Sequence, residues 1–170
     1  MKAQHLLSAV LLLAAAGQAS ADSAILTFTG NVLPGTCTVT PNVAVTLDNI
    51  PLNDLVPGSV NLGYQKPVVL HFTGCVGVSS VEVTFDGTAD PTQNGQWKNL
   101  AVGGATNVAV LLLEGTSGNT TLTRGMKRVV TIGGAAAGRL DMRTSYSHWP
   151  GTVPTPGDVS TQITVIADYR

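Results

Sequence analysis

The sequence predicts an all-β fold, and three observations carry that prediction. Apolar residues alternate with polar ones at a period of two in many short segments, which is typical of half-buried strands. Nineteen glycines and nine prolines supply turns between those segments. Charged residues make up only 11% of the chain, and β-branched residues are frequent throughout. Together these features favour an antiparallel sandwich or barrel over a helical domain.

The first 21 residues have the pattern of a secretory signal peptide. Lys2 gives a positive start, residues 6–16 are apolar apart from one serine, and small residues at 19–21 offer a cleavage site. The apolar run is too short for a permanent membrane anchor, and its flanks disfavour the alternative of a buried N-terminal helix. We therefore expect an exported mature chain that begins at Asp22.

Alternating segments then follow one another, separated by loops rich in Gly, Pro and Asn. We expect strands over residues 24–32, 43–47, 68–72, 81–85, 96–102, 108–113, 127–132 and 140–146. The segment 108–113 is apolar at both parities, so the sequence does not assign its inward face. No internal repeat or linker is evident, and the mature length of about 150 residues fits one domain.

The most strongly patterned segment is 157–170, at the end of the sequence. Its polar residues mostly share one face, so we expect a half-buried strand there. The opposite face carries Val159, Thr161, Ile163, Val165, Ala167 and Tyr169. Because terminal segments usually fray, a strand of this kind needs something to hold it.

Two cysteines in an exported chain make a disulfide between Cys37 and Cys75 the expected reading. Closing a loop of that length destabilises the unfolded chain by about 4 kcal/mol in the chain-entropy account. His71 lies four residues before Cys75, but a metal site needs a third and a fourth ligand, and none is evident.

Composition argues against several functions. With a net charge of −1, the chain has no excess of basic residues that would bind nucleic acid or attract it to an anionic membrane surface. We expect no cofactor and no enzymatic activity, because His71 and His148 are the only histidines after residue 21 and no serine lies in a nucleophile elbow. A weakly charged surface does little to oppose self-association.

Several motifs, taken in order, resemble the pilin subunits of bacterial fimbriae assembled by the chaperone–usher pathway, of the type 1 kind. They are the alternating segment with Gly30 seven residues before the first cysteine, residues 36–39 (Thr-Cys-Thr-Val), residues 72–75 (Phe-Thr-Gly-Cys) and the strand-like run 104–113. Tyr169 is a penultimate aromatic, and Gly157 lies fourteen residues from the end. The resemblance covers essentially the whole mature sequence.

The resemblance implies an incomplete immunoglobulin-like (Greek-key) β-sandwich that lacks its final strand. In this family a periplasmic chaperone first lends a strand to the open groove, and the N-terminal extension of the next subunit then replaces it during secretion through the outer-membrane usher. This is donor-strand complementation, a form of β-augmentation. It implies a fimbrial subunit exported through the periplasm to the cell surface, with neighbouring pilins, chaperone and usher as partners.

Carried over by position, the resemblance divides the chain into a signal peptide (1–21), a donor extension (22–35) and a pilin domain (36–170). The donor face would be Ala24, Leu26, Phe28, Gly30 and Val32. The acceptor groove and chaperone contact would be Gly157, Val159, Thr161, Ile163, Val165, Ala167, Tyr169 and Arg170, with the Arg170 carboxylate anchored by basic chaperone residues. The alternative is a closed sandwich in which 24–32 is the first strand and 159–169 pairs internally.

A second function stays open, that of a single-domain adhesive subunit. Trp97, His148 and Trp149 could contribute to a surface that contacts a glycan or another receptor, since aromatic faces stack on sugars. The simpler interpretation is that Trp97 packs in the core and Trp149 caps one end of the sandwich. The sequence does not distinguish a major subunit from a minor one.

Overall fold

Antiparallel strands in two sheets build the computed structural model, which describes residues 27–31 and 35–170. The chain divides into two units, 1–32 and 33–170, and each is treated by itself. In the first unit the described residues 27–31 are exposed and form no strand. All strands described below belong to the second unit.

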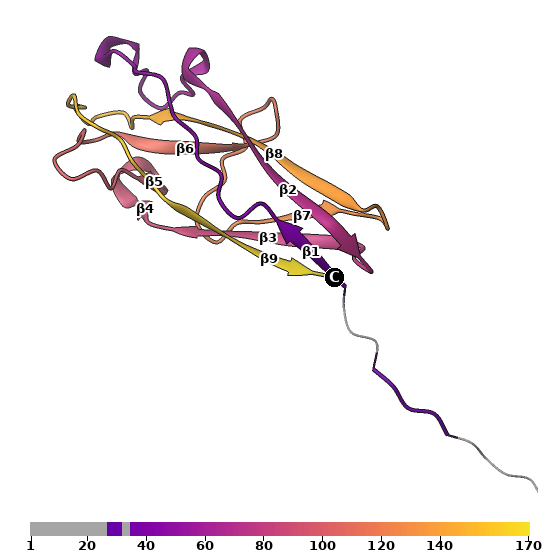
Figure 1. Ribbon diagram of the computed structural model, residues 1–170. Coiled ribbons are helices and arrows are strands. Elements are labelled where there is room, and N and C mark those ends of the chain that lie inside the picture. Colours follow the sequence, from indigo (N-terminus) through magenta and orange to yellow (C-terminus); the bar gives the residue numbers. More distant parts are fainter. Residues whose placement is uncertain (1–26, 32–34) are drawn as a thin grey trace, which may run out of the picture. The chain divides into compact units, whose positions relative to one another are not determined.

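The larger sheet has six strands in the order β1-β2-β8-β6-β5-β4 (Figure 1). The central strands β2 (Lys66–Val76) and β8 (Ala137–Ser147) pair over eight residues, from Lys66↔Thr144 to Thr73↔Ala137. The others are short: β1 (Thr36–Val39), β4 (Ala89–Asp90), β5 (Gln96–Lys98) and β6 (Ala109–Glu114). Single 3₁₀ turns occur at Leu52–Asp54, Leu62–Tyr64 and Pro91–Gln93.

The smaller sheet has three strands in the order β7-β3-β9. β3 (Ser80–Gly87) lies in the middle, with β7 (Lys127–Thr131) on one side and β9 (Ile163–Tyr169) on the other. β3 alternates strictly, since Val81, Val83 and Phe85 are fully buried while the residues between them are partly exposed. That alternation is the predicted pattern of residues 81–85.

The core lies between the two sheets. Phe72, Trp97, Leu113 and Leu122 are fully buried in the described part of the chain, together with the inward residues of β3. The Trp97 indole Nε1 donates to the Leu122 carbonyl oxygen at 2.9 Å, so this polar atom is paired although it is buried. A smaller apolar cluster, of Leu55, Ala105, Val108 and Tyr146, lies at one end.

The structure confirms the all-β prediction and most of the expected strands, and it adds β1 and β4, which were not predicted. Three expected strands differ. Residues 43–47 form no strand, because the side of this segment that would complete a ladder faces open space rather than another strand. The strand expected over 96–102 ends at Lys98, where the chain turns into the 99–105 loop. The last strand begins at Ile163 rather than near 159, because residues 158–160 bond to that loop instead.

The strand expected over 24–32 lies partly outside the described residues, and 27–31 show no ladder. Among the described residues, no helix has the length and apolar character needed to cross a membrane.

Candidate functional site

β9 is an edge strand whose outer main-chain groups have no strand beside them in the described structure. Ser80 and Arg170 exchange both main-chain hydrogen bonds, at 3.1 and 2.9 Å, so they form a hydrogen-bonded pair. In an antiparallel ladder such pairs alternate with non-bonded ones. Val81 and Tyr169 are therefore a non-bonded pair, and the N–H and C=O groups of Tyr169 point away from β3. The same holds for every second residue of β9 before it. These residues are Ile163, Val165, Ala167 and Tyr169.

An open groove of about 1100 Å³ runs along the outer side of β9. One wall is residues 155–165, and the other is the segment 40–55, which contains no strand and which Figure 1 shows running from β1 past the free side of β9. Its floor is apolar and comes from the large sheet, through Val68, Leu70, Val110, Leu112 and Met142. The groove therefore opens directly onto the hydrophobic core.

The structure brings most of the predicted acceptor residues to this groove. Those that line it are Gly157, Val159, Thr161, Ile163 and Val165. Ala167 and Tyr169 lie farther along β9, where they pack half-buried against the core. Arg170 is exposed and lies beyond the groove. The alternation predicted for this segment is present, with the odd-numbered residues from 159 to 169 half-buried and the residues between them exposed.

The second wall is held to the large sheet by polar contacts around Asp48. The Lys66 ammonium lies 2.6 Å from the Asp48 carboxylate, and the Tyr146 hydroxyl donates to the Asp48 carbonyl oxygen at 3.0 Å. A phenol is protonated at neutral pH, and burial of Tyr146 raises its pKa further, so this hydroxyl can donate. The wall is thus positioned without a ladder of its own.

Asn99 fixes the beginning of the other wall, and no feature of the sequence indicated it. Its amide nitrogen donates to Ala105 O at 2.8 Å and to Asp158 O at 2.9 Å. Its amide oxygen accepts from Ala101 N at 3.1 Å and from Ser160 N at 2.9 Å. One side chain therefore joins the 99–105 loop to the residues that lead into β9. Its partners lie up to 61 positions away, so no local pattern could have revealed it.

Gly157 also has a packing role at this junction. A Cβ at Gly157 would lie 2.5 Å from Ala105 N and 2.7 Å from Gly104 C, closer than real side chains approach a backbone. A Cβ at Gly104 would in turn overlap the Asp158 carbonyl oxygen. The two chain segments approach backbone to backbone, which requires glycine at both positions.

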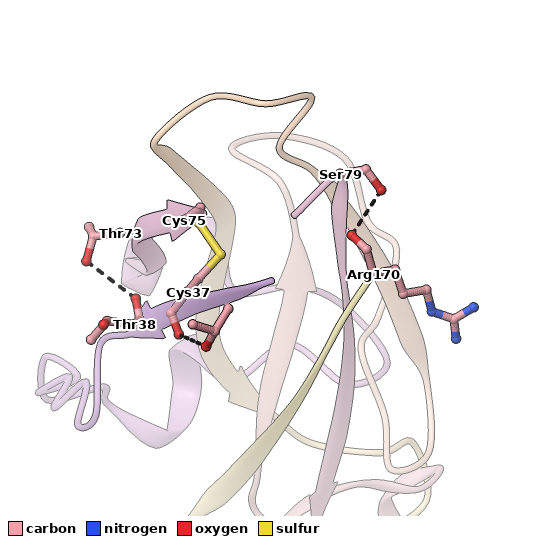
Figure 2. The surroundings of a disulfide bond; sticks show 7 residues. Cys37, Thr38, Thr73, Cys75, Ser79 and Arg170 are labelled. Atoms are coloured by element: carbon pink, nitrogen blue, oxygen red, sulfur yellow. Dashed lines mark hydrogen bonds between the residues drawn. A yellow bond between two sulfur atoms is a disulfide. The ribbon is translucent and has the colours of Figure 1, made fainter. Parts of the chain in front are cut away.

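The disulfide lies at the opposite end of the domain, where β1 begins and β9 ends (Figure 1), and Figure 2 shows its surroundings. It joins Cys37 on β1 to Cys75 on β2, as predicted. Nearby, a main-chain oxygen of Arg170 accepts hydrogen bonds from Ser79 N at 2.6 Å, from Ser80 N at 3.1 Å and from Ser79 Oγ at 2.9 Å. The end of β9 is therefore tied to the beginning of β3.

Charged side chains gather on the outer face of the small sheet. Glu82 accepts from the Lys127 ammonium at 2.7 Å and lies 3.2 Å from the Arg170 guanidinium. The hydrogen bond from Lys127, aided by the charge of Arg170, lowers the pKa of the Glu82 carboxyl against a smaller opposing effect of desolvation. The amide of Gly87 and the guanidinium of Arg124 likewise lower the pKa of Asp86.

The aromatic surface considered for an adhesive role is smaller than the sequence suggested. Trp97 is fully buried, and His148 is 4% exposed beside the Thr152 hydroxyl. Trp149 is 39% exposed, and its main-chain N–H donates to Gln93 Oε1 at 2.6 Å. Of the three, only Trp149 presents an aromatic face to solvent. His71 is exposed on the outer face of β2, as its parity predicted.

Of the predicted donor residues, the structure describes Phe28 and Gly30, both exposed. Ala24, Leu26 and Val32 lie outside the described residues. Within 27–31 and 35–170, no cluster of three or more His, Cys, Asp or Glu side chains is arranged to hold a metal ion.

Known proteins share this fold and its sequence features. The family described as "Fimbrial protein" matches residues 26–170. The S-fimbrial adhesin protein SfaS of Escherichia coli O6:K15:H31 (strain 536 / UPEC) is 34% identical over an alignment of 155 residues that covers 89% of this chain and 88% of the relative.

Solved structures agree on the fold. The P pilus rod subunit PapA matches 79% of this chain and 99% of its own, with a TM-score of 0.63 at 14% identity. A subunit of a chaperone–usher pilus matches 91% of this chain and 100% of its own, with a TM-score of 0.58 at 16% identity. The chain therefore belongs to the fimbrial protein family, and it is a pilus subunit that is exported to the cell surface.

Proposed function

We propose that the groove beside β9 receives a donor strand from a neighbouring subunit, and that residues 22–33 of each chain, within the extension 22–35, are the inserted donor. The observation that carries this proposal is that β9, in the part of the chain that the structure describes, has both unpaired main-chain groups and an open apolar groove on the same side. Among the described residues, no strand pairs with the outward main-chain groups of Ile163, Val165, Ala167 and Tyr169, and the groove beside them opens onto the core. A single extended segment supplies both a ladder and apolar side chains.

The proposed donor has the chemistry that this groove requires. Leu26, Phe28 and Val32 are apolar and share one parity, so they enter the groove together while the intervening residues face solvent. A phenylalanine alone buries about 150–250 Å². Gly30 brings only backbone to the groove, so it fits where the opposing wall leaves no room for a side chain.

The position of the domain's first described residue indicates the direction of the donor. Gly35 packs against the Val76–Gly77 backbone, near the end of β9, so each subunit's own extension leaves from there. If the donor strand ran parallel to β9, the folded domain of the donating subunit would lie at that same end. There it would collide with the extension that leaves the accepting subunit. A donor antiparallel to β9 places its body beside residues 157–161, at the far end. We therefore propose antiparallel insertion.

The same groove would be a target for the periplasmic chaperone before assembly at the outer-membrane usher. An exposed core and an unpaired edge favour aggregation, so a subunit of this kind needs protection in the periplasm. Capture through the Arg170 carboxylate stays a prediction. The proposed role is structural rather than enzymatic.

The test is assembly in the native host with a matched pair of substitutions. Gly30→Val adds a branched side chain to the face that enters the groove, whereas Thr29→Val places the same valine side chain on the opposite face with almost no change in volume. Surface material is sheared off and compared on a denaturing gel before and after boiling. We expect wild type and Thr29→Val to give ladders that collapse to monomer on boiling, and Gly30→Val to give none. Equal ladders from both variants would overturn the donor assignment.

A second candidate function is adhesion by the subunit itself. The relative that is 34% identical is described as an S-fimbrial adhesin protein, and Trp149 is a half-exposed aromatic side chain in an uncharged loop. Fibres carrying Trp149→Ala would then assemble normally but lose binding to a host glycan array. Unchanged glycan binding by Trp149→Ala fibres would contradict an adhesive role for Trp149.

A further inference from the structure

We propose that successive subunits also touch through the two ends of their folded domains, in a contact separate from the donor strand. The loop end is formed by residues 99–107 and 148–158, beside the beginning of β9. The disulfide end is formed by residues 73–80 and 131–138. This inference rests on the proposed donor-strand function, and it adds an interface that the donor strand does not itself provide.

The loop end is apolar, exposed and nearly free of charge. Val102 is fully exposed, Val153 is 78% exposed and Leu100 is 45% exposed. Asp158 is the one Asp, Glu, Lys or Arg in residues 99–107 and 148–158. The two loops are joined by the Asn107 amide, which donates to Val153 O at 2.8 Å. Exposed apolar groups held together in this way mark a contact surface.

The disulfide end has the same character. Val76 is 72% exposed, and Ala135, Ala136 and Ala137 are exposed beside it. Residues 73–80 and 131–138 contain no Asp, Glu, Lys or Arg. Cys75 N donates to Ala136 O at 3.0 Å, so the two turns form one surface. The charged side chains described above lie on the outer face of the small sheet instead.

The length of the chain between donor and domain brings these two ends together. Val32 is the last inward residue of the proposed donor, and β1 begins at Thr36. A chain of four residue steps spans at most about 14 Å. Because an antiparallel donor leaves the groove beside residues 157–161, the disulfide end of the donating subunit must lie within that reach of the loop end. The occupant of the loop end is therefore the domain that donates the strand.

This contact is weak by itself and forms because the donor strand tethers the two domains. A short tether gives an effective concentration of about the millimolar range, so a small apolar contact can be well populated in a fibre and absent between free subunits. Few charges lie at either end, because Asp158 is the one charged residue of the loop end and Arg170 is the one that the main chain holds against Ser79 and Ser80 at the disulfide end. Little charge therefore has to be desolvated when the contact forms. The contact would limit the bending of each joint.

Cross-linking within assembled fibres tests the proposal. A chain carrying Val102→Cys and Ala135→Cys is assembled, sheared from the cell and treated with a short bismaleimide. We expect ladders that resist boiling, because the new thiols of adjacent subunits lie close together. The control carries Val129→Cys with Ala135→Cys; Val129 is 63% exposed but lies on the outer face of β7, so we expect monomer after boiling.

Fibre stiffness supplies a second measurement that needs no added cysteine. Val102→Asp places a carboxylate in the contact, so the persistence length measured by electron microscopy should fall to about half or less, whereas Val129→Asp should leave it unchanged. Boil-labile ladders with no cross-link at position 102 and unchanged stiffness in Val102→Asp would overturn this contact alone. A wild-type fibre with no boil-labile ladder would overturn the donor-strand function itself.

Discussion

Replacing Asn99 by alanine should loosen the wall of the groove, and the structure gives the size of the effect. The side chain takes part in four hydrogen bonds that join the 99–105 loop to residues 158–160. A typical bond contributes about 1 kcal/mol net. Asp158 O keeps a second donor, Ala105 N at 2.9 Å, and exposed groups regain water, so about half of the total is lost. We therefore expect Asn99→Ala to cost about 2 kcal/mol.

A loss of that size lowers the melting temperature of a domain this long by about 4–8 °C. Thermal unfolding of the purified chain, followed by circular dichroism, measures it. The yield of boil-labile ladder from cells should fall as well, since the residues leading into β9 are no longer fixed. The matched control is Asn119→Ala, because Asn119 is exposed and its side chain makes no hydrogen bond within the described residues. Its free energy of unfolding should change by about 0.5 kcal/mol or less. Equal melting temperatures for the two variants would refute the assignment of Asn99 as a clamp.

Three further predictions concern stability. Replacing both Cys37 and Cys75 by alanine frees a crosslink of sequence separation 38, so the free energy of unfolding in denaturant titration should fall by about 4 kcal/mol; a loss under about 1 kcal/mol would contradict this. The folded pKa of Glu82 lies below its unfolded value, so the stability that this carboxylate contributes is present above about pH 4.3 and is lost as the pH falls through the folded pKa. The difference in melting temperature between wild type and Glu82→Gln should therefore shrink when the pH is lowered below that value. A difference that stays constant would argue against a stabilising ion pair at Glu82. Gly157→Ala forces a Cβ against the backbone at 104–105, so the yield of folded chain should fall, and an unchanged melting temperature would contradict the packing argument.

The sequence predicted the strands whose periodicity reflects burial. Residues 81–85 and 159–169 alternate because one face of each segment packs on the core, and the structure reproduces both patterns. The run 108–113 was ambiguous because both of its faces are buried: β6 lies inside the large sheet, between β5 and β8. Periodicity reports the environment of side chains, and here it was sufficient.

Residues 43–47 show where that reasoning stops. Val43, Val45 and Leu47 alternate like a strand, but a strand also needs a hydrogen-bonding neighbour, and the groove occupies that position. Asn99 was missed for a different reason, because its value depends on loop backbones brought together only by the fold. Local sequence carries information about burial, whereas ladder partners and clamps depend on distant segments.

The outward main-chain groups of β9 have a mechanical consequence. Hydrogen bonds in an antiparallel ladder run perpendicular to the strands. In the proposed joint, tension along a fibre pulls the donor parallel to β9, so the bonds of Ile163, Val165, Ala167 and Tyr169 are sheared together instead of opening one after another. A joint built in this way resists a steady pull far better than it resists peeling from one end.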